Sequence, residues 1–523
     1  MRRGVLIFIC IVLASLLVAP AVNILAAPDR DAIRWNRKAF LYNMDFASRW
    51  LARLLYPLGI STDPKQVIVG RDGWLYLGDL HEQTLSVDRR LPTQADIAQG
   101  RLIGAAAEAW DAYLASRGVK VFRIIIAPNK SAIYPEHMPA WARPALSNAT
   151  DALLAAAARG RYIDLRLPLL AAKPSHQEAL YYKTDTHWNF LGAALAFRAF
   201  AQQVGEADRE LQWPSDKAYG VSRVDPRGGG DLANFLRLTE SLADHEPVIH
   251  AASLSVDTTQ SDFDTRRLLR RGGNPAVESP TRPLLVSCAG ALNDRKVLWL
   301  RDSFGTALAP LMAATFSEVL QLHWDEAIKP GGRFVQLIEE WKPDYVFVTV
   351  VERASRTPWF AAYPPPVIVP KGRDFRAIRT SSIFGSNHLG RGRSSNEHQV
   401  NGNDPFVDFA LSDPVVPSEA RYLSVDLTCA DGSGAVPLQL FWLEAGKPYF
   451  DEEHSARFAF RTGQNLIDLR TIPKWGGATA ISRIRLDIES KDSCSLFKLD
   501  SPSLGMNSQA PAFGLSPNGT ERR

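Results

Sequence analysis

The chain has 523 residues, more than one ordinary domain holds, so two or more domains are expected. Apolar residues make up 46% and charged residues 22%, a balance that excludes a disordered chain and is typical of a folded globular protein. The formal net charge of +4 is small for this length, and no long Lys/Arg block occurs in the body of the chain. No nucleic-acid partner is therefore predicted.

Residues 1–27 are predicted to be a membrane anchor or a signal segment. No residue from Val5 to Val22 is charged, and about 18–20 such residues suffice to cross a bilayer as a helix. The alternative is a cleaved signal peptide, whose apolar region is usually about 7–15 residues long, so an uncleaved anchor is favoured. A single span at the N-terminus favours export of everything after it. A basic, amphipathic juxtamembrane segment, residues 28–66, follows.

Residues 67–365 are predicted to form an α/β domain. "VKVFRIIIAPNK" from Val119 and "PDYVFVTVVER" from Pro343 are continuous apolar runs typical of buried parallel strands. Such strands alternate with helical patterns such as residues 190–204, which predicts a parallel sheet with helices on both faces. The section 206–282 is rich in Gly, Asp and Arg and has weak periodicity, so loops are expected there.

The pattern changes after residues 366–403, a stretch rich in Gly, Ser, Arg and Asn that we interpret as a linker. Residues 404–505 contain short alternating strands without helical patterning, which predicts an all-β sandwich or jelly roll. This region resembles a carbohydrate-binding module, and residues 506–523 are expected to be disordered. The aromatic residues that are candidates to stack on sugar rings, unless they belong to the core, are Trp442, Tyr449, Phe450 and Trp475.

Four cysteines are present, and none of their spacings fits a zinc site. Cys429 and Cys494 each lie near a strand-like segment, and in an exported protein they could form a disulfide. Cys10 lies in the apolar N-terminal stretch, and Cys288 is expected to be free.

A candidate nucleophile lies in "LWLRDSFGTAL", Leu298 to Leu308, where a strand ends and a helix begins. Ser303 at this turn projects from the carboxyl end of a parallel strand, where open α/β sheets hold their sites. Backbone N–H groups at a helix N-terminus favour developing negative charge, which suits a serine nucleophile whose oxyanion is held partly by its own amide. The alternative is that Asp302 or Ser303 only caps the helix.

A second polar turn, "YYKTDTHWN" from Tyr181 to Asn189, holds an acid and an imidazole two residues apart. A serine nucleophile needs a base, and the base needs a group that orients it. His187 and Asp185 could fill these roles; the alternatives are a capping Asp beside a surface His, or two metal ligands. No further ligands lie nearby in the sequence, so no metal is predicted. We expect the two turns to meet, with His187 within hydrogen-bonding reach of Ser303 and Asp185 behind it.

Together, "YYKTDTHWN" and "LRDSFGTAL" resemble the alginate O-acetyltransferase family of the AlgX and AlgJ type, a branch of the SGNH hydrolase superfamily. Weaker support comes from "VGRDGWLYL", "IIIAPNKSAIYPE", "GGGDLANFL" and "PDYVFVTVVER". The resemblance covers about Val67 to Glu352 and implies Ser303 as nucleophile, His187 as base and Asp185 as its orienting group. In a typical SGNH chain the serine comes first, so the reversed order here implies a circularly permuted SGNH-hydrolase-like sheet.

The usual oxyanion-hole groups of the superfamily, a glycine and an asparagine at two strand ends, are replaced by His323-Trp324 and Glu352-Arg353. Arg353 is a candidate to stabilise the oxyanion; alternatively, it forms a structural salt bridge with Glu352. Asn129 and Lys130, at another strand end, are candidates to line the substrate site, with capping of the next element as the alternative.

The resemblance implies a periplasmic O-acetyltransferase of an exported polysaccharide, anchored in the inner membrane by its N-terminal segment and working without a cofactor. A membrane O-acyltransferase partner would supply the acetyl group, since acetyl-CoA is not available outside the cytoplasm. An acetylesterase with the same triad and a non-catalytic polysaccharide-binding assembly factor are the alternatives. The polymer, the donor and the oligomeric state cannot be inferred from the sequence.

Overall fold

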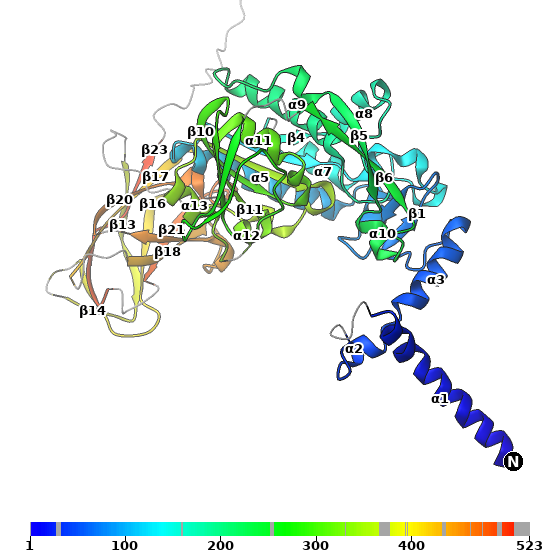
Figure 1. Ribbon diagram of the computed structural model, residues 1–523. Helices are drawn as coiled ribbons and strands as arrows, with labels where there is room; N and C mark the ends of the chain where they lie inside the picture. The colour runs from blue at the N-terminus through cyan, green and yellow to red at the C-terminus, as the bar shows by residue number, and fades with distance from the viewer. Residues whose placement is uncertain are drawn as a thin grey trace, which may run out of the picture. The chain divides into compact units, whose positions relative to one another are not determined.

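The computed structural model describes most of the chain (Figure 1). The described residues are 2–27, 33–157, 160–250, 256–329, 331–365, 377–392, 394, 396–430, 436–460, 462–472, 474–488 and 494–506. They form two compact units. The first comprises Met1–Arg101, Val121–Gly332 and Pro343–Trp359, and the second comprises Leu102–Lys120, Arg333–Lys342 and Phe360–Arg523.

The first unit is built around an eight-stranded sheet, counted over the described residues, in the order β4-β3-β12-β10-β11-β9-β7-β8. The first five strands of this order are parallel. They are β4 (Tyr162–Asp164), β3 (Val121–Ala127), β12 (Tyr345–Val351), β10 (Asn293–Arg301) and β11 (Phe316–Leu322). Every residue of β12 is buried, as a strand covered on both faces requires. The predicted α/β architecture is confirmed.

Three antiparallel strands extend this sheet beyond β11, so the sheet is mixed rather than parallel throughout. They are β9 (Leu284–Ala289), β7 (Asp257–Asp262) and β8 (Leu268–Arg271), and a separate hairpin is formed by β5 (Val221–Gly228) and β6 (Ala243–Ile249). Residues 206–282, where loops and short excursions are expected, thus contain four strands among the described residues. Strands such as β5 and β8 are mostly exposed, so they lack the apolar run that marks a buried strand.

Helices of the first unit lie between these strands in the chain. They are α4 (Thr84–Asp88), α6 (Lys130–Ile133), α7 (Ala149–Ala156), α8 (Arg166–Ala172), α9 (Phe190–Ala207), α10 (Asp231–Phe235), α11 (Ala309–Thr315) and α12 (Trp324–Ile328). The N-cap of α9 is Asn189, whose side chain accepts a hydrogen bond from the Gly192 N–H at 3.0 Å. The ring of Phe200 packs 4.9 Å from that of Phe347 in β12, so α9 is fixed against the sheet directly after the Asp185-Thr186-His187 turn.

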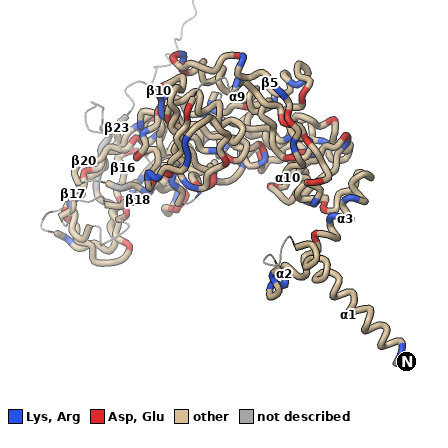
Figure 2. Tube along the Cα trace, viewed as in Figure 1, with Lys and Arg blue, Asp and Glu red and all other residues tan. Residues whose placement is uncertain are grey.

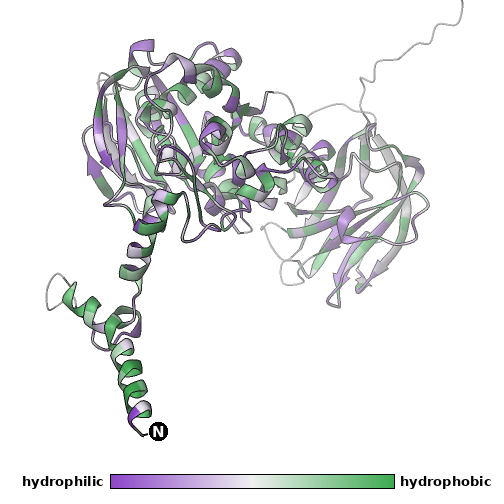
Figure 3. Cartoon of the chain, turned by 90° about the vertical axis from the view of Figure 1, so that its right-hand side faces the viewer, coloured by the Kyte–Doolittle hydropathy of each residue, from purple (hydrophilic) through white to green (hydrophobic). Residues whose placement is uncertain are grey.

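The N-terminal part contains α1 (Arg2–Leu25), α2 (Lys38–Leu41) and α3 (Asp45–Leu55), followed by the predicted hairpin of β1 (Val67–Val69) and β2 (Leu75–Leu77). Residues Arg3–Leu25 have a mean hydropathy of 3.0 over 18 residues, and α1 carries charge only at its start (Figures 2 and 3). By length and composition α1 could cross a membrane. A signal sequence has the same character, so both predictions for residues 1–27 stay open.

The second unit combines two helices with an antiparallel β-structure. The helices are α13 (Phe334–Trp341) and the part of α5 (Gln94–Ser116) that begins at Leu102. The ring of Trp110 in α5 lies 4.6 Å from that of Phe334 in α13. The strands are β13 (Ala377–Asn387), β14 (Leu389–Arg391), β15 (Glu397–Val400), β16 (Phe406–Val415), β17 (Ala420–Cys429), β18 (Val436–Glu444), β19 (Ser455–Phe460), β20 (Gly463–Asp468), β21 (Ile481–Ile488), β22 (Leu496–Leu499) and β23 (Ser503–Met506). The predicted all-β region is present. Part of the segment interpreted as a linker, 366–403, forms β13 to β15; its residues 366–376 lie outside the described residues, as does the tail beyond Met506.

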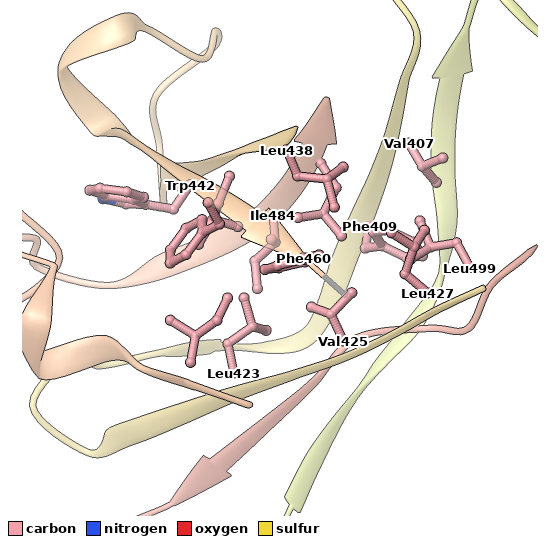
Figure 4. Packing of buried hydrophobic residues seen from close by; sticks show 14 of the residues in the cluster. Val407, Phe409, Leu423, Val425, Leu427, Leu438, Trp442, Phe460, Ile484 and Leu499 are labelled. Carbon is pink, nitrogen blue, oxygen red and sulfur yellow. The ribbon is translucent and has the colours of Figure 1, made fainter. Parts of the chain in front are cut away.

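The core of this β-structure corrects two sugar-stacking candidates. Trp442 and Trp475 are each only 1% exposed and belong to the buried cluster shown in Figure 4. A ring sealed in the core cannot stack on a sugar, so these two residues are structural. Tyr449 is 81% exposed and Phe450 is half-buried. Cys429 and Cys494 form a disulfide, with Cα atoms 5.8 Å apart.

Candidate active site

Ser303 lies at the carboxyl end of β10, at the start of the short 3-10 helix η8 (Ser303–Thr306). Asp302 caps this helix, because its Oδ1 accepts a hydrogen bond from the Phe304 N–H at 3.0 Å. The other carboxylate oxygen accepts from the Val351 N–H at 2.7 Å and from Trp324 Nε1 at 3.4 Å. The capping alternative therefore applies to Asp302 and not to Ser303, which is exposed.

The tight turn after Ser303 depends on Gly305. A Cβ atom at this position would lie 2.2 Å from Arg301 Cδ and 2.9 Å from Trp299 Cζ2. Arg301 is fully buried and donates hydrogen bonds to the carbonyls of Val277 and Glu278 at 2.6 and 2.8 Å. These bonds fix the guanidinium of Arg301, so its side chain cannot move away and only glycine fits against it at position 305.

The two polar turns meet as expected. His187 Nε2 lies 2.7 Å from Ser303 Oγ, and His187 Nδ1 lies 2.7 Å from Asp185 Oδ1. A neutral imidazole that donates from Nδ1 to a carboxylate leaves Nε2 as the acceptor for the serine proton. The arrangement can therefore activate Ser303 as a nucleophile, and its side chains come from segments 116 residues apart.

Asp185 is held as an anion. Burial disfavours its charged form, but the hydrogen bond and electrostatic attraction of His187, together with the charge of Arg227, outweigh burial, so the pKa of Asp185 lies below its ordinary value of 3.8. Arg227 Nη2 donates to Asp185 Oδ2 at 3.0 Å, and its guanidinium stacks 3.8 Å above the ring of Tyr182. Gly230 packs directly on the carboxylate, since a Cβ there would lie 2.5 Å from Asp185 Oδ2.

Asp231 is a site residue that the sequence reasoning missed. Its Oδ1 accepts from the Thr186 N–H at 2.7 Å, its Oδ2 accepts from the Thr186 hydroxyl, and Oδ2 lies 3.8 Å from His187 Nδ1. The signal in the sequence is the "GGGD" run in "GGGDLANFL", which places a carboxylate directly after three glycines. Asp231 thus fixes the residue between the acid and the base.

Asp185, His187 and Asp231 each offer a ligand atom, and these atoms lie within 4.8 Å of one another, close enough to hold a metal ion. Their acceptor atoms are already engaged: Asp185 binds Arg227 and His187, and Asp231 binds Thr186. A divalent cation would have to displace a guanidinium and the imidazole, so the donor set fits a metal poorly.

Lys130 supports the Asp185-His187 turn. It is 5% exposed, and its Nζ donates to the carbonyls of Tyr182, Lys183 and Asp185 at 3.1, 3.0 and 2.7 Å. Burial lowers its pKa to about 7, against the opposing charges of nearby aspartates. All three bonds go to backbone carbonyls, which gives Lys130 a positioning role. It also lines a small cavity with Asn129, Thr186 and Arg353, so its role as a substrate-lining residue stays a prediction.

Asn129 and Glu352 form a buried polar network beside the site. Asn129 donates from its backbone N–H to Glu352 Oε2 at 2.9 Å and from Nδ2 to Asp88 Oδ2 at 3.3 Å. Arg353 Nη1 donates to Asn129 Oδ1 at 3.4 Å, whereas Glu352 pairs with Arg166 at 3.7 Å. Arg353 therefore contacts Asn129, and the ion pair of Glu352 is with Arg166.

A cavity of about 520 Å³ lies at the carboxyl ends of β11 and β12, the two strands that flank β10. Two of its walls touch the Ser303 turn: Trp324 hydrogen-bonds Asp302, and the Arg353 guanidinium lies 5.9 Å from the Phe304 ring centre. Its volume falls in the usual range for small-molecule sites. The lining residues are Glu82, Val87, His323, Trp324, Asp325, Arg353, Arg356, Thr357, Pro358 and Trp359.

We expect Asp231→Asn to lower the turnover number about tenfold while the substrate concentration at half-maximal rate stays nearly unchanged, because the amide weakens the Thr186 contacts that orient His187. The measurement is a pair of saturation curves for the parent chain and the variant. Asp225→Asn, on an exposed part of the β5 hairpin, is the matched control and should leave both parameters unchanged. If Asp225→Asn lowered the turnover number as much as Asp231→Asn, a specific role for Asp231 would be contradicted.

Asp88 should make stability depend on pH. Burial raises the pKa of Asp88 to about 7, helped by the charge of Glu352, whereas the unfolded value is 3.8. The folded state then holds the extra proton between these values, so the free energy of unfolding falls as pH rises from about 4 to about 7. We compare the free energies of unfolding of Asp88→Asn and the parent chain, measured by denaturant unfolding in detergent at pH 5 and at pH 8. The difference, variant minus parent, is expected to rise by about 2 kcal/mol from the lower to the higher pH. A difference that is the same at both pH values would contradict this prediction.

Residues 67–278 match the family described as "SGNH hydrolase-like domain, acetyltransferase AlgX". Curated relatives include "Probable alginate O-acetylase AlgJ" of Pseudomonas aeruginosa, 32% identical over 178 residues, and that of Pseudomonas syringae pv. tomato, 33% identical over 180 residues. Each match covers 33% of this chain and 41% of the relative, so the chain spans well under two thirds of these relatives.

Solved structures give weaker similarity. The O-acetyltransferase domain of Pseudomonas putida AlgJ is 21% identical with a TM-score of 0.37, covering 56% of this chain and 92% of that one. Pseudomonas aeruginosa AlgX is 12% identical with a TM-score of 0.34, covering 84% and 95%. These scores are too low to carry an argument about the site, and Ser303 lies outside the residues matched to the family. Residues 67–278, with Asp185, His187 and Asp231 among them, are therefore similar to the SGNH hydrolase-like acetyltransferase domain of the AlgX type.

Proposed function

We propose that this protein transfers an acetyl group through a Ser303 acyl-enzyme onto hydroxyl groups of an exported polysaccharide. The observation that carries the proposal is the relay from Ser303 Oγ through His187 to Asp185, in which both contacts measure 2.7 Å. The acetyltransferase family of residues 67–278 supports acetyl transfer. The curated relatives' description as alginate O-acetylases supports a polysaccharide acceptor, with alginate as the nearest example.

In the first half-reaction, Ser303 Oγ attacks the acetyl carbonyl carbon while His187 Nε2 takes the hydroxyl proton. The negative charge of Asp185 stabilises the imidazolium that forms. The imidazolium then gives this proton to the leaving group of the donor, the bond between the acetyl group and the donor breaks, and acetyl-Ser303 remains. General base catalysis of this kind contributes about 10²–10⁴-fold to the rate.

In the second half-reaction, a sugar hydroxyl attacks the acetyl-Ser303 carbonyl carbon. His187 Nε2 takes the proton of this hydroxyl and returns it to Ser303 Oγ as the ester bond to the serine breaks. The product is an O-acetyl sugar, and the enzyme is restored without any cofactor. In this proposal the cavity beside the site receives the sugar, and Arg353 in its wall is the cation that stabilises the oxyanion.

An acetylesterase that uses the same residues is the second candidate. The His187 side chain is 27% exposed, so water can reach an acyl-serine unless a bound acceptor excludes it. Where α1 is retained as an anchor, the protein would work at the outer face of the inner membrane. The acetyl group would then come from a membrane O-acyltransferase partner, and Tyr449 would be an exposed sugar contact on the β-structure.

The proposal is tested with the full chain in detergent, p-nitrophenyl acetate as donor, and either an oligouronate or a neutral cello-oligosaccharide as acceptor. We expect O-acetylated oligosaccharide, together with an acetylated peptide that contains Ser303 when the acceptor is left out. Acetate release at one rate with or without sugar, and no acetylated sugar, would establish the esterase instead. Absence of acetyl-Ser303 together with sustained product formation would exclude the serine mechanism.

A further inference from the structure

The helix α3 is amphipathic, but it turns its polar side, not its apolar side, towards the protein. Ala52, which is 2% exposed, packs into the body of the first unit, in a cluster that includes Val67 and Leu236. Polar residues make the other contacts of this side: Arg53 Nε donates to Ser241 Oγ at 3.2 Å, Asp45 accepts from Arg237 Nε at 2.8 Å, and Arg49 lies 3.9 Å from Glu240. The polar side of α3 therefore faces the protein.

The opposite side of α3 is apolar and exposed. Trp50, Leu51 and Leu54 are 68%, 42% and 55% exposed. At about 100° per residue, Trp50 and Leu54 lie about 160° around the helix from Ala52. The apolar surface continues after the helix through Leu58, which is 68% exposed. A surface helix of a globular protein turns its apolar stripe to the core, so this outward stripe needs another apolar environment.

The start of α3 is tied to the end of α1, the helix long enough to cross a bilayer. Asn23, near the end of α1, donates from Nδ2 to the carbonyls of Leu41 and Asn43, both at 2.9 Å. Asp45, the first residue of α3, follows two positions later and is bound to Asn43 through its backbone N–H at 2.7 Å. A bilayer spanned by α1 would therefore have its surface close to the start of α3.

The connecting segment has the composition of a membrane interface. Trp35, Tyr42 and Met44 are 65%, 51% and 53% exposed, and Arg37 and Lys38 between them are exposed as well. Trp and Tyr are enriched where a protein leaves the hydrocarbon region, and Lys/Arg beside them are attracted to anionic headgroups. These features favour lipid over a protein partner as the occupant of the apolar stripe.

We propose that α3 lies in the headgroup region of the bilayer that α1 spans, with Trp50, Leu51 and Leu54 turned into the lipid. The inference requires α1 to be retained rather than cleaved, and it is independent of the reaction catalysed. It also links the bilayer to the site, because Arg237 and Leu236, which contact α3, directly follow α10, whose first residue is Asp231. The catalytic turn is thereby held at a fixed height above the lipid surface.

The test uses the full chain reconstituted into vesicles of phosphatidylethanolamine and phosphatidylglycerol. A nitroxide is attached to Leu54→Cys in a Cys10→Ala background, where Cys288 is buried and the other two cysteines are paired. Collision rates with oxygen and with a water-soluble nickel chelate report the depth of the label. We expect a depth of about 5–10 Å below the headgroups, as for interfacial helices, with oxygen favoured over nickel. Ser48→Cys, an exposed position on the polar side of α3, is the matched control and should favour nickel.

A Leu54 label as accessible to nickel as the Ser48 label would overturn the proposal. Protection from both reagents would also overturn it, because it would indicate a protein contact such as a second copy of this chain. These vesicles contain no other protein. If the label at position 54 became inaccessible to nickel only after a second membrane protein was added, that protein and not lipid would cover the apolar stripe. None of these outcomes depends on acetyl transfer, so failure here leaves the proposed function unaffected.

Discussion

Ser303→Ala and His187→Ala are each expected to lower acetyl transfer by about 10³-fold or more, because either change removes the nucleophile or the base that activates it. Ser303 is exposed and its hydroxyl contacts only His187 among the described residues, so folding should be unchanged. The measurement is the initial rate of sugar acetylation, with thermal unfolding of each variant run in parallel. The double variant should be no slower than the slower single one, since the two side chains act as a unit.

The matched control is Ser222→Ala, which removes an exposed hydroxyl from the β5 hairpin and should keep the full rate. Loss of only a few-fold in Ser303→Ala would mean that another group accepts the acetyl. If the factors by which the two single variants lower the rate multiply in the double variant, His187 and Ser303 act in separate steps. Either result would replace the mechanism proposed here.

Lys130→Met is expected to lower the free energy of unfolding by about 3 kcal/mol, because it leaves the buried carbonyls of Tyr182 and Asp185 without a donor and removes one of the two donors to the carbonyl of Lys183. Those carbonyls belong to the turn that carries Asp185, so acetyl transfer should fall about 10²-fold even at temperatures where the variant is folded. Denaturant unfolding and initial rates measure the two effects. The methylene groups of methionine fill most of the space of the lysine, so loss of packing is a minor part.

Lys183→Met is the control for the same turn, since Lys183 Nζ makes one exposed hydrogen bond to the carbonyl of Asp72 at 3.2 Å. Its expected cost is below about 0.5 kcal/mol, with activity unchanged. If Lys130→Met were as stable as this control, the three hydrogen bonds would not hold the turn. If it were unstable but fully active when folded, Lys130 would support the fold without positioning Asp185.

The parallel strands were predictable because a strand covered on both faces must be apolar throughout, as β12 is. The strands β5 and β8 could not be found in this way: they are largely exposed and are held by pairing with a neighbour, which leaves little trace in composition. The aromatic candidates of the β-structure failed for a related reason. Trp442 in β18 and Trp475 in a turn are buried, whereas Tyr449 in the loop after β18 is exposed, and residue type alone does not reveal which aromatic side chains the packing covers.

Within the site, residue types and their order along the chain determined the three candidates Asp185, His187 and Ser303, and the prediction that their two turns meet. The supporting groups were decided by tertiary structure. Asp231 lies 45 residues from Thr186, and Lys130 lies 55 residues from Asp185. Both reach the turn only because the sheet brings separate segments together.

The sequence by itself determined the features that show in a short stretch of residues. These are a bilayer-length apolar stretch, buried parallel strands, and two polar turns at the ends of elements. Tertiary structure alone decided which polar groups face one another and which aromatic and apolar side chains are covered. The physical reason is that hydrophobic periodicity is a local property, whereas the partner of a buried charge, such as Arg227 for Asp185, is chosen by the packing of distant segments. The outward stripe of α3 shows the same division, since its amphipathic pattern was visible in the sequence and the side that faces the protein was not.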